Sequence, residues 1–182
     1  MNPRSQADDT ENSSPVWILL GHKAGDNNQV TALAESLGVP FAAKHLRYRA
    51  TELITNVLLG PTLAGIPTRY RQQLAPPWPR VVISAGRRNE PIARWIRRQA
   101  DGPVRLVHVG RPWARPDRFD LIVATPQYAL DGHPNVIALD LPLHRISEAR
   151  LADAAEDWRS RMAGLPQPRI AVLVGGDSGP FH

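Results

Sequence analysis

Short apolar runs, separated by amphipathic stretches, recur along the whole chain. Most of these runs are nearly continuous rather than alternating, which is typical of strands buried on both faces of a parallel sheet. Each is short enough to be a single strand and is bounded by polar, glycine or proline residues. We expect seven strands, at Val16–Leu20, Phe41–Leu46, Arg80–Ser84, Val104–Val109, Asp120–Thr125, Asn135–Asp140 and Arg169–Val174.

Helical spacing of apolar residues appears between several of the predicted strands. It favours helices over Gln29–Leu37, Pro91–Ala100 and Ser147–Leu165. Pro91 suits the first turn of its helix, and Ser147 suits an N-cap. On the last helix, the predicted buried face consists of Leu151, Ala155, Trp158 and Met162. Strands that alternate with helices predict an α/β fold, a Rossmann-like doubly wound and mainly parallel sheet.

The distribution of polar and proline residues suggests three segments. Residues 1–14 are polar, and we expect a disordered tail. Residues 15–165 hold the strand and helix pattern of one Rossmann-like domain. A proline joint at 166–168 precedes a strand and a glycine turn, so 168–182 look like the opening of a second domain. The alternative, a last strand that closes the first sheet, stays open.

Composition excludes several classes of chemistry. The 182 residues contain no cysteine, which rules out disulfides, thiol nucleophiles and cysteine-ligated metals. The six histidines show no HExxH or HxH spacing, so we expect no metal site. There is no G-x-S-x-G elbow of an α/β-hydrolase. The longest strongly apolar runs are far below the ~20 residues of a membrane span, and no leader is visible, so we expect a cytoplasmic protein.

The middle of the chain is strongly basic. Residues 44–118 contain 15 Lys and Arg against 4 Asp and Glu, a balance of +11 within a total of +5. Of the 22 basic residues 20 are arginine, which suits phosphate binding but also follows from a GC-rich genome. No aromatic-interleaved or helix-turn-helix pattern accompanies the charge, so we expect no specific nucleic-acid binding.

The loop after the first strand carries the first candidate site. It reads GHKAGDNNQ from Gly21 to Gln29 and matches neither a Walker A loop nor GxGxxG. Ligands of open parallel sheets bind beyond the carboxyl ends of the strands, where this loop lies. We predict that Lys23 meets an anion and that Asp26 or His22 accepts a proton. The plainer alternative is that Asp26 or Asn27 caps the following helix.

Other predicted strands are also followed by polar residues. Arg87 and Arg88, in SAGRRNEP, stand where a helix dipole and guanidinium groups both favour an anion, although they could equally be solvated surface arginines. Together, the loops after the strands predict one polar cleft. We expect its anion- and substrate-binding residues to be Lys23, Asn27, Gln29, Arg87, Arg88, Arg111, Gln127, Tyr128, His144 and Arg145.

A membrane-contact hypothesis rests on Leu53–Pro67. This stretch has no charge, and arginines at 47, 49, 69 and 71 flank it. Apolar residues between basic flanks can seat a protein on an anionic bilayer, which would make the protein membrane-peripheral. A core helix with a covering loop is the commoner arrangement and the one that we favour.

Six segments, in order, resemble one known family. They are WILLGHKAGDNNQ, SAGRR, VGRP, FDLIVATPQY, NVIALDLPLHR and PRIAVLVGGDSG. Together they resemble the bacterial relatives of the elongated-mitochondria (mitochondrial fission) protein family. That family looks like a GT-B glycosyltransferase, in which two Rossmann-like domains face each other across a cleft. Its members continue through a complete second domain, of which this sequence shows only the first strand and glycine turn.

The resemblance implies roles for particular residues. Residues 15–165 would be the acceptor-side domain, with Gly21, Lys23, Gly25, Asp26 and Gln29 in the first signature and Arg87 and Arg88 in the second. A donor-side glycine loop would comprise Gly175, Gly176 and Ser178.

The implied function is a metal-independent glycosyltransferase. It would use a nucleotide-sugar donor, an unidentified acceptor and no other cofactor, and Asp26 or His22 would deprotonate the acceptor. The alternative is a non-catalytic binding or scaffolding domain that associates with a protein partner or a membrane surface.

Overall fold

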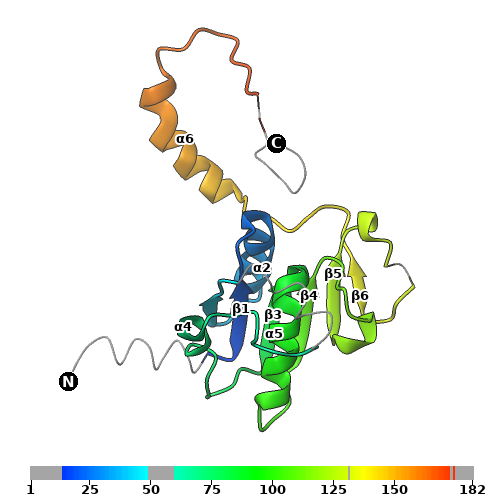
Figure 1. Ribbon diagram of the computed structural model, residues 1–182. Coiled ribbons are helices and arrows are strands. Elements are labelled where there is room, and N and C mark those ends of the chain that lie inside the picture. Colours follow the sequence, from blue (N-terminus) through cyan, green and yellow to red (C-terminus); the bar gives the residue numbers. More distant parts are fainter. Residues whose placement is uncertain (1–13, 49–59, 131, 173, 175–182) are drawn as a thin grey trace, which may run out of the picture. The chain divides into compact units, whose positions relative to one another are not determined.

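The computed structural model describes residues 14–48, 60–130, 132–172 and 174, in two compact units, Met1–Arg145 and Ile146–His182. The first unit is an α/β sheet domain (Figure 1). Its elements are β1 (Val16–Leu20), α2 (Ala24–Ser36), β2 (Phe41–His45), α4 (Thr68–Arg71), β3 (Val81–Ala85), α5 (Gly86–Gln99), β4 (Arg105–Val109), β5 (Leu121–Ala124) and β6 (Val136–Ala138).

The six strands form one all-parallel sheet in the order β2-β1-β3-β4-β5-β6. Val16 on β1 pairs with Phe41 on one side and with Val81 on the other. After β2 has been added on one side of β1, the chain therefore crosses over and adds β3 and all later strands on the other side. This change of side marks the topological switch point, where open α/β sheets bind ligands. The predicted Rossmann-like, parallel fold class is confirmed.

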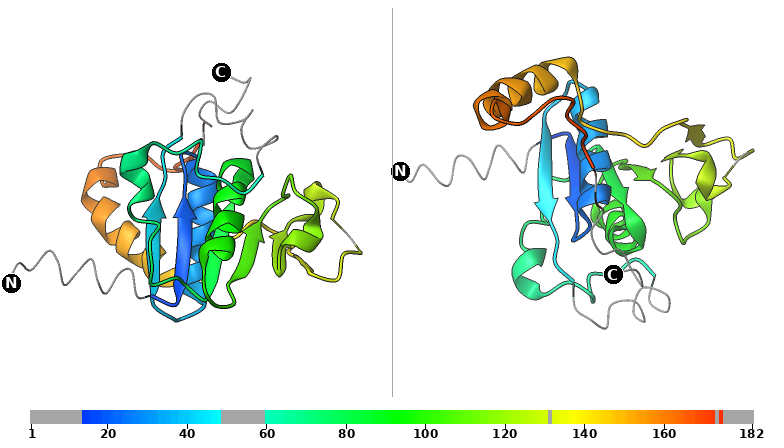
Figure 2. Two further views of the ribbon diagram at one scale, coloured as in Figure 1. Left: turned by 60° about the horizontal axis from the view of Figure 1, so that its bottom comes forward. Right: turned by 90° about the horizontal axis from the view of Figure 1, so that it is seen from above.

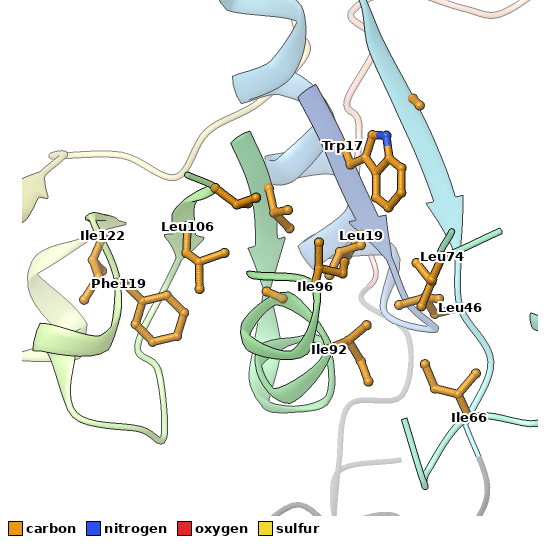
Figure 3. Close-up of a cluster of buried hydrophobic side chains, with 14 of the residues drawn as sticks. Trp17, Leu19, Leu46, Ile66, Leu74, Ile92, Ile96, Leu106, Phe119 and Ile122 are labelled. Carbon is orange, nitrogen blue, oxygen red and sulfur yellow. The ribbon is translucent and has the colours of Figure 1, made fainter. Parts of the chain in front are cut away.

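Side chains of β1 alternate between two apolar cores, one on each face of the sheet. Trp17 and Leu19 pack in the cluster that contains Ile92 and Ile96 of α5, shown in Figure 3. Residues 16, 18 and 20 pack in the cluster that contains Val30 of α2. All five residues of β1 are buried because a helix covers each face. This double burial explains the continuous apolar run that the sequence shows.

Helix α4 lies beyond the end of β2, as the right-hand view of Figure 2 shows. The side-chain amide of Gln73, just after α4, donates to the carbonyl of His45 at 2.7 Å. Nearby, Ile66 is fully buried and Leu63 packs against the same core. These two residues belong to the stretch considered for membrane contact, and here they serve the core. The rest of that stretch, up to residue 59, lies outside the described residues, so membrane contact stays a prediction.

Helix α5 begins earlier than the sequence predicts. The expected start was Pro91, but the helix starts at Gly86, directly after β3. The chain turns sharply there because Gly86 adopts a φ of +72°, which glycine tolerates. Pro91 therefore lies inside the helix, where its missing N–H removes one hydrogen bond. As a consequence Arg87 and Arg88 belong to the first turn of α5 rather than to a loop.

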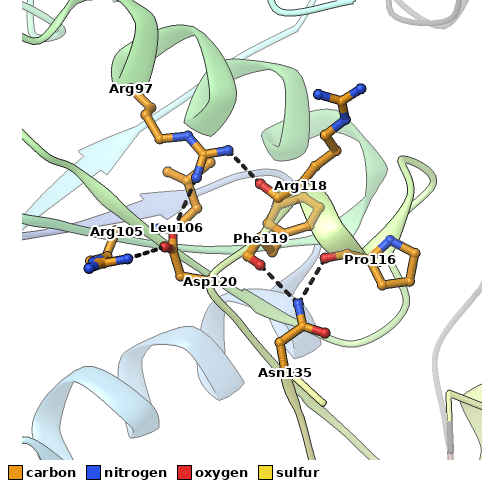
Figure 4. A network of polar contacts seen from close by, with 8 residues as sticks. All are labelled: Arg97, Arg105, Leu106, Pro116, Arg118, Phe119, Asp120 and Asn135. Atoms are coloured by element: carbon orange, nitrogen blue, oxygen red, sulfur yellow. Dashed lines mark hydrogen bonds and ion pairs between the residues drawn. The ribbon is translucent and has the colours of Figure 1, made fainter. Parts of the chain in front are cut away.

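A polar network joins the amino ends of β4 and β5 (Figure 4). Asp120 accepts hydrogen bonds from Arg105 (2.7 Å), Arg97 (3.1 Å) and the backbone N–H of Leu106 (2.8 Å). Burial alone raises the pKa of Asp120, but these hydrogen bonds and cations outweigh it and hold the pKa below its usual value. Two arginines of the basic middle are thus structural, and they lie at the end of the sheet opposite to the switch point.

The second unit contains helix α6 (Glu148–Met162). The predicted N-cap is confirmed, because Ser147 Oγ accepts a hydrogen bond from the Arg150 N–H at 3.3 Å. The prediction that one apolar face of this helix is buried is wrong. Leu151 is 58% exposed and Trp158 is 53% exposed, so these side chains rest on no core within the described residues.

The seventh predicted strand, Arg169–Val174, is not formed over the part of this range that the structure describes. Residues 169–172 have no regular structure, and Ile170 and Val172 are exposed. A strand requires a neighbour for its backbone hydrogen bonds, and a β-rich sequence alone does not supply one. A second domain that begins near 168, and a first domain that ends near 165, stay predictions. No helix among the described residues is both long enough and apolar enough to cross a membrane.

Candidate functional site

A pocket of about 340 Å³ opens at the carboxyl ends of β1, β3 and β4, at the switch point. The loops that follow these strands, together with two tyrosines, supply its walls. Its volume lies at the lower end of the range for small-molecule sites, ~300–1,000 Å³. The lining residues are Gly21, His22, Lys23, Asp26, Asn27, Tyr48, Ala85, Gly86, Arg87, Arg88, Asn89, Val109, Gly110, Arg111, Trp113 and Tyr128.

The first wall is the turn from β1 into α2. The side-chain amide of Asn27 holds this turn, since its Oδ1 accepts from the Gly21 N–H at 2.8 Å and its Nδ2 donates to the Gly21 carbonyl at 2.9 Å. Asn27 was predicted to bind the anion, but its amide instead braces the loop. Neither Asp26 nor Asn27 caps α2, whose N-cap position is Lys23 and carries no side-chain cap. The carboxylate of Asp26 therefore serves no capping role.

The second wall is the turn from β3 into α5. Asn89, which is buried, donates through Nδ2 to the carbonyls of Leu19 (3.0 Å) and Ala85 (3.1 Å), and its Oδ1 accepts from the hydroxyl of Tyr48. One amide thus ties β1, β3 and the segment after β2 together beneath the pocket. No side chain caps α5 either, so the first turns of both helices bring their N–H groups to the pocket walls.

Four cationic side chains line the pocket, and Asp26 is the one acidic residue among the lining residues that the structure describes. They are Lys23, Arg87, Arg88 and Arg111. The two helix N-termini add positive partial charge at the same place. Guanidinium groups and helix N-termini are the groups that bind phosphate in proteins, so the pocket has the electrostatic character of an anion site.

His22 faces Arg88 across the pocket mouth, with His22 Nδ1 3.4 Å from Arg88 Nη1. Partial burial lowers the pKa of His22, and the charges of Arg88 and Lys23 lower it further. The imidazole is therefore neutral near pH 7. Because arginine can only donate, Nδ1 of His22 is the acceptor, and the proton of the neutral ring resides on Nε2. His22 thus presents a hydrogen-bond donor at Nε2, and Asp26 supplies the only carboxylate among the described lining residues.

The third wall is the segment after β4, which carries Arg111 and Trp113. Arg111 Nη1 donates to the carbonyl of Tyr128 at 3.1 Å. The carboxylate of Glu90, on α5, accepts from the N–H groups of Trp113 (2.7 Å) and Ala114 (2.9 Å). Glu90 is buried, and that burial raises its pKa, although the two backbone hydrogen bonds and Arg94 oppose the rise. A buried side chain therefore fixes this segment from behind.

The structure brings most of the predicted site residues together. Gln29 lies beside the pocket and lines a small adjacent hollow that also contains Tyr128. Besides Gln29, three other predicted residues are not in the pocket lining. They are Gln127, which is exposed after β5, His144, and Arg145. Arg145 instead forms a two-point ion pair with Glu35 of α2, with Nε to Oε2 at 2.9 Å and Nη2 to Oε1 at 2.5 Å.

His144 and Arg145 lie outside this lining because β6 ends at Ala138, six residues before His144, and their predicted role in binding stays a prediction. The predicted donor residues Gly175, Gly176 and Ser178 lie outside the described residues. No cluster of three potential metal ligands occurs in the described part of the chain.

Three lining residues with polar or aromatic side chains escaped the sequence analysis: Tyr48, Asn89 and Trp113. A positional signal existed for each of them. Tyr48 follows β2 by three residues, Trp113 follows β4 by four, and Asn89 belongs to the same SAGRRNEP segment as the two predicted arginines. The sequence analysis passed over these positions in favour of other charged and polar residues in the same loops.

A cation-lined pocket at the switch point of a parallel sheet defines a Rossmann-like domain with an electropositive pocket. The sequence model of the Mitochondrial fission ELM1 family matches residues 24–182, so the chain belongs to this family. It is 29% identical, over 143 residues, to the Mitochondrial fission protein ELM1 of Arabidopsis thaliana, a match that covers 65% of this chain and 33% of the relative. The chain thus spans about a third of that relative's length. No solved structure matches significantly.

Proposed function

We propose that this chain is the acceptor-side domain of a metal-independent glycosyltransferase of GT-B type, which takes its sugar from a nucleotide sugar. One observation carries the proposal: four cations and two uncapped helix N-termini converge on a pocket whose acidic lining residue is Asp26. Such a pocket suits an acceptor with an anionic group and a hydroxyl. The resemblance to GT-B enzymes supplies the reaction class.

In the proposed reaction the acceptor oxygen attacks the anomeric carbon of the donor. The bond between that carbon and the nucleoside diphosphate breaks, and the diphosphate leaves with the bonding electrons. Asp26 takes the proton of the acceptor hydroxyl. Lys23, Arg87 and Arg88 hold the anionic group of the acceptor, and His22 donates to it through Nε2. No metal ion is required, because cations and backbone N–H groups balance the charge.

Binding is tested first, with inorganic phosphate as the probe in isothermal titration calorimetry. The double variant Arg87→Ala/Arg88→Ala is expected to lose at least tenfold in phosphate affinity. Arg98→Ala is the matched control, because Arg98 is an exposed arginine of the same helix that does not line the pocket. Equal affinities for all three proteins would contradict an anion site at the switch point.

Catalysis is tested with protein purified from its own cells, radiolabelled UDP-, GDP-, ADP- and dTDP-sugars, and an extract of the same cells as the acceptor source. Asp26→Asn is expected to lower transfer at least ~100-fold and to leave phosphate affinity within about twofold, since loss of a general base costs ~10²–10⁴ in rate. Asp101→Asn, an exposed carboxylate away from the pocket, serves as control. Normal transfer by Asp26→Asn would show that another group takes the proton.

A non-catalytic binding or scaffolding role is the second candidate. The observation in its favour is the exposure of apolar side chains in the second unit, where Leu151, Trp158 and Ile170 are 53–85% exposed. Apolar groups in such numbers often mark a protein-binding surface. Absence of transfer from every nucleotide sugar, together with loss of a purified partner's binding in Leu151→Ser/Trp158→Ser, would favour this role over catalysis.

A further inference from the structure

Trp113 stands at the rim of the pocket with 60% of its surface exposed. Its backbone is held in place: its own N–H and that of Ala114 donate to the buried carboxylate of Glu90. Gly110, which begins the segment, has a φ of +86°, and its Cα lies against the ring of Tyr128, since an added Cβ would stand 3.5 Å from that ring. The indole is therefore presented to solvent by a fixed segment.

An exposed indole on a fixed segment at the edge of a pocket is well placed to contact a bound ligand. A ligand that covers Trp113 would bury apolar surface of the indole. The Glu90 carboxylate that fixes the segment is itself buried, and this burial has a desolvation cost. Trp158 is exposed to a similar extent and also has an arginine over its ring, Arg161 at 5.1 Å, but Trp158 lines no described pocket. Trp113 differs from Trp158 in two respects: it lines the pocket, and its backbone N–H is bound by the Glu90 carboxylate.

The arginine beside Trp113 indicates what covers the indole. Cζ of Arg87 lies 5.0 Å from the centroid of the indole ring. A phosphate held by Arg87 therefore places the group directly attached to it next to the indole. In a sugar phosphate that group is the sugar ring, whose polarised C–H face suits the negative face of an indole. In a nucleotide the base lies farther away, beyond the ribose. The pocket volume of about 340 Å³ also suits a sugar phosphate.

We propose that Trp113 is a specificity-determining platform for the sugar ring of a hexose phosphate, whose phosphate is bound by Arg87 and the neighbouring cations. The proposal rests on the function proposed above and names the class of acceptor: a phosphorylated sugar. The sugar ring stacks on the indole, and Glu90 positions the indole through the backbone of its segment.

The experiment compares ligand pairs on the full chain by isothermal titration calorimetry. The probes are inorganic phosphate, the 1-phosphates of glucose, galactose and mannose, ribose 5-phosphate and uridine monophosphate. We expect at least one hexose 1-phosphate to bind at least tenfold more tightly than phosphate. Trp113→Ala is expected to abolish this gain and to leave phosphate affinity within about twofold. Trp113→Phe is expected to retain most of the gain, and Trp158→Ala, the matched control, all of it.

Each other outcome overturns the proposal at a different point. If the wild type binds no phosphate, the anion site fails and this inference fails with it. If phosphate binds but no hexose phosphate binds better, only the sugar platform is wrong. If Trp113→Ala weakens phosphate and hexose phosphate equally, the indole has a structural role. If uridine monophosphate binds more tightly than ribose 5-phosphate, and Trp113→Ala removes this difference in affinity, a base rather than a sugar stacks on the indole.

Discussion

Asp26 and Gly86 lie so close together that a Cβ on Gly86 would stand 2.6 Å from Oδ2 of Asp26. The contact joins the first turn of α2 to the first residue of α5, which are the two helix starts that line the pocket. A Cβ at this position would force the Asp26 carboxylate, the far end of a flexible side chain, to move, so glycine keeps the carboxylate in place. The φ of +72° at Gly86 favours glycine independently.

Gly86→Ala is therefore expected to affect both stability and the site. The left-handed backbone alone is expected to lower the free energy of unfolding by ~1–2 kcal/mol, and the displaced Asp26 carboxylate adds to this. Urea denaturation measures the first effect, and sugar transfer measures the second. Gly25→Ala is the control, because nothing lies within 4 Å of its added Cβ, and its stability should change little or rise. Equal stability of the two variants would contradict the close contact.

The titration of His22 reports on anion binding. Burial and the nearby cations lower its pKa, so a bound phosphate, which brings negative charge, is expected to raise it. NMR titration of the histidine ring signals, with and without saturating phosphate, measures the change. His133, which is exposed and lines no described pocket, provides the internal reference. A His22 pKa that moves no more than that of His133 would place the bound phosphate elsewhere.

Glu90→Gln tests how the Trp113 segment is held. A glutamine side chain offers one acceptor oxygen, so one of the two N–H groups, of Trp113 or Ala114, loses its partner. An unpaired buried donor costs ~1–3 kcal/mol, and we expect a loss of stability in this range. Hydrogen exchange at these two amides should become at least tenfold faster. Glu156→Gln, an exposed carboxylate of α6, should change neither quantity. Unchanged exchange rates in Glu90→Gln would show that other contacts fix the segment.

His108 makes stability depend on pH. It lies on β4 and is fully buried, with Nδ1 3.1 Å from Oγ of Ser84 on β3, and burial lowers its pKa from 6.5 to about 3. Between these values the unfolded chain binds the proton and the folded chain does not, so stability is lost as the pH falls below 6.5. Between pH 7 and pH 5 the loss from this residue is about 2 kcal/mol.

Urea denaturation of the wild type and of His108→Met at both pH values measures this contribution. The methionine variant should lack this part of the pH dependence, whereas His133→Gln, a change at an exposed histidine, should retain it. An identical pH dependence in the wild type and in His108→Met would show that the imidazole is protonated in the folded state.

The sheet could be predicted well where residues are buried on both faces. Val16–Leu20 was predicted with the observed bounds, because burial on two faces requires every residue of the run to be apolar. The run Arg169–Val174 looks the same in sequence, yet no strand forms over its described residues, since pairing depends on a neighbour that local sequence does not encode. The start of α5 was misjudged because Pro91 is a stronger local signal than the turn at Gly86.

The site could be predicted as far as topology alone determines it. Parallel strands end at one edge, so Lys23, Arg87 and Arg111, each shortly after a strand, necessarily meet there. Arg145 follows its strand at a greater distance and pairs with Glu35, a partner far away in sequence. The role of Asn27 as a brace could not be predicted either, because it depends on the direction of an amide.

Because like charges gather in the pocket, the thermal stability of the domain can be used to detect a ligand that binds there. Folding brings together cations that repel one another, so an anion that binds only the folded state raises the melting temperature, by an amount that grows with the logarithm of its concentration relative to its Kd. A metabolite library could therefore be screened by melting temperature alone, without any knowledge of the reaction. The compound that stabilises the domain most would be the first candidate ligand to test in the proposed reaction.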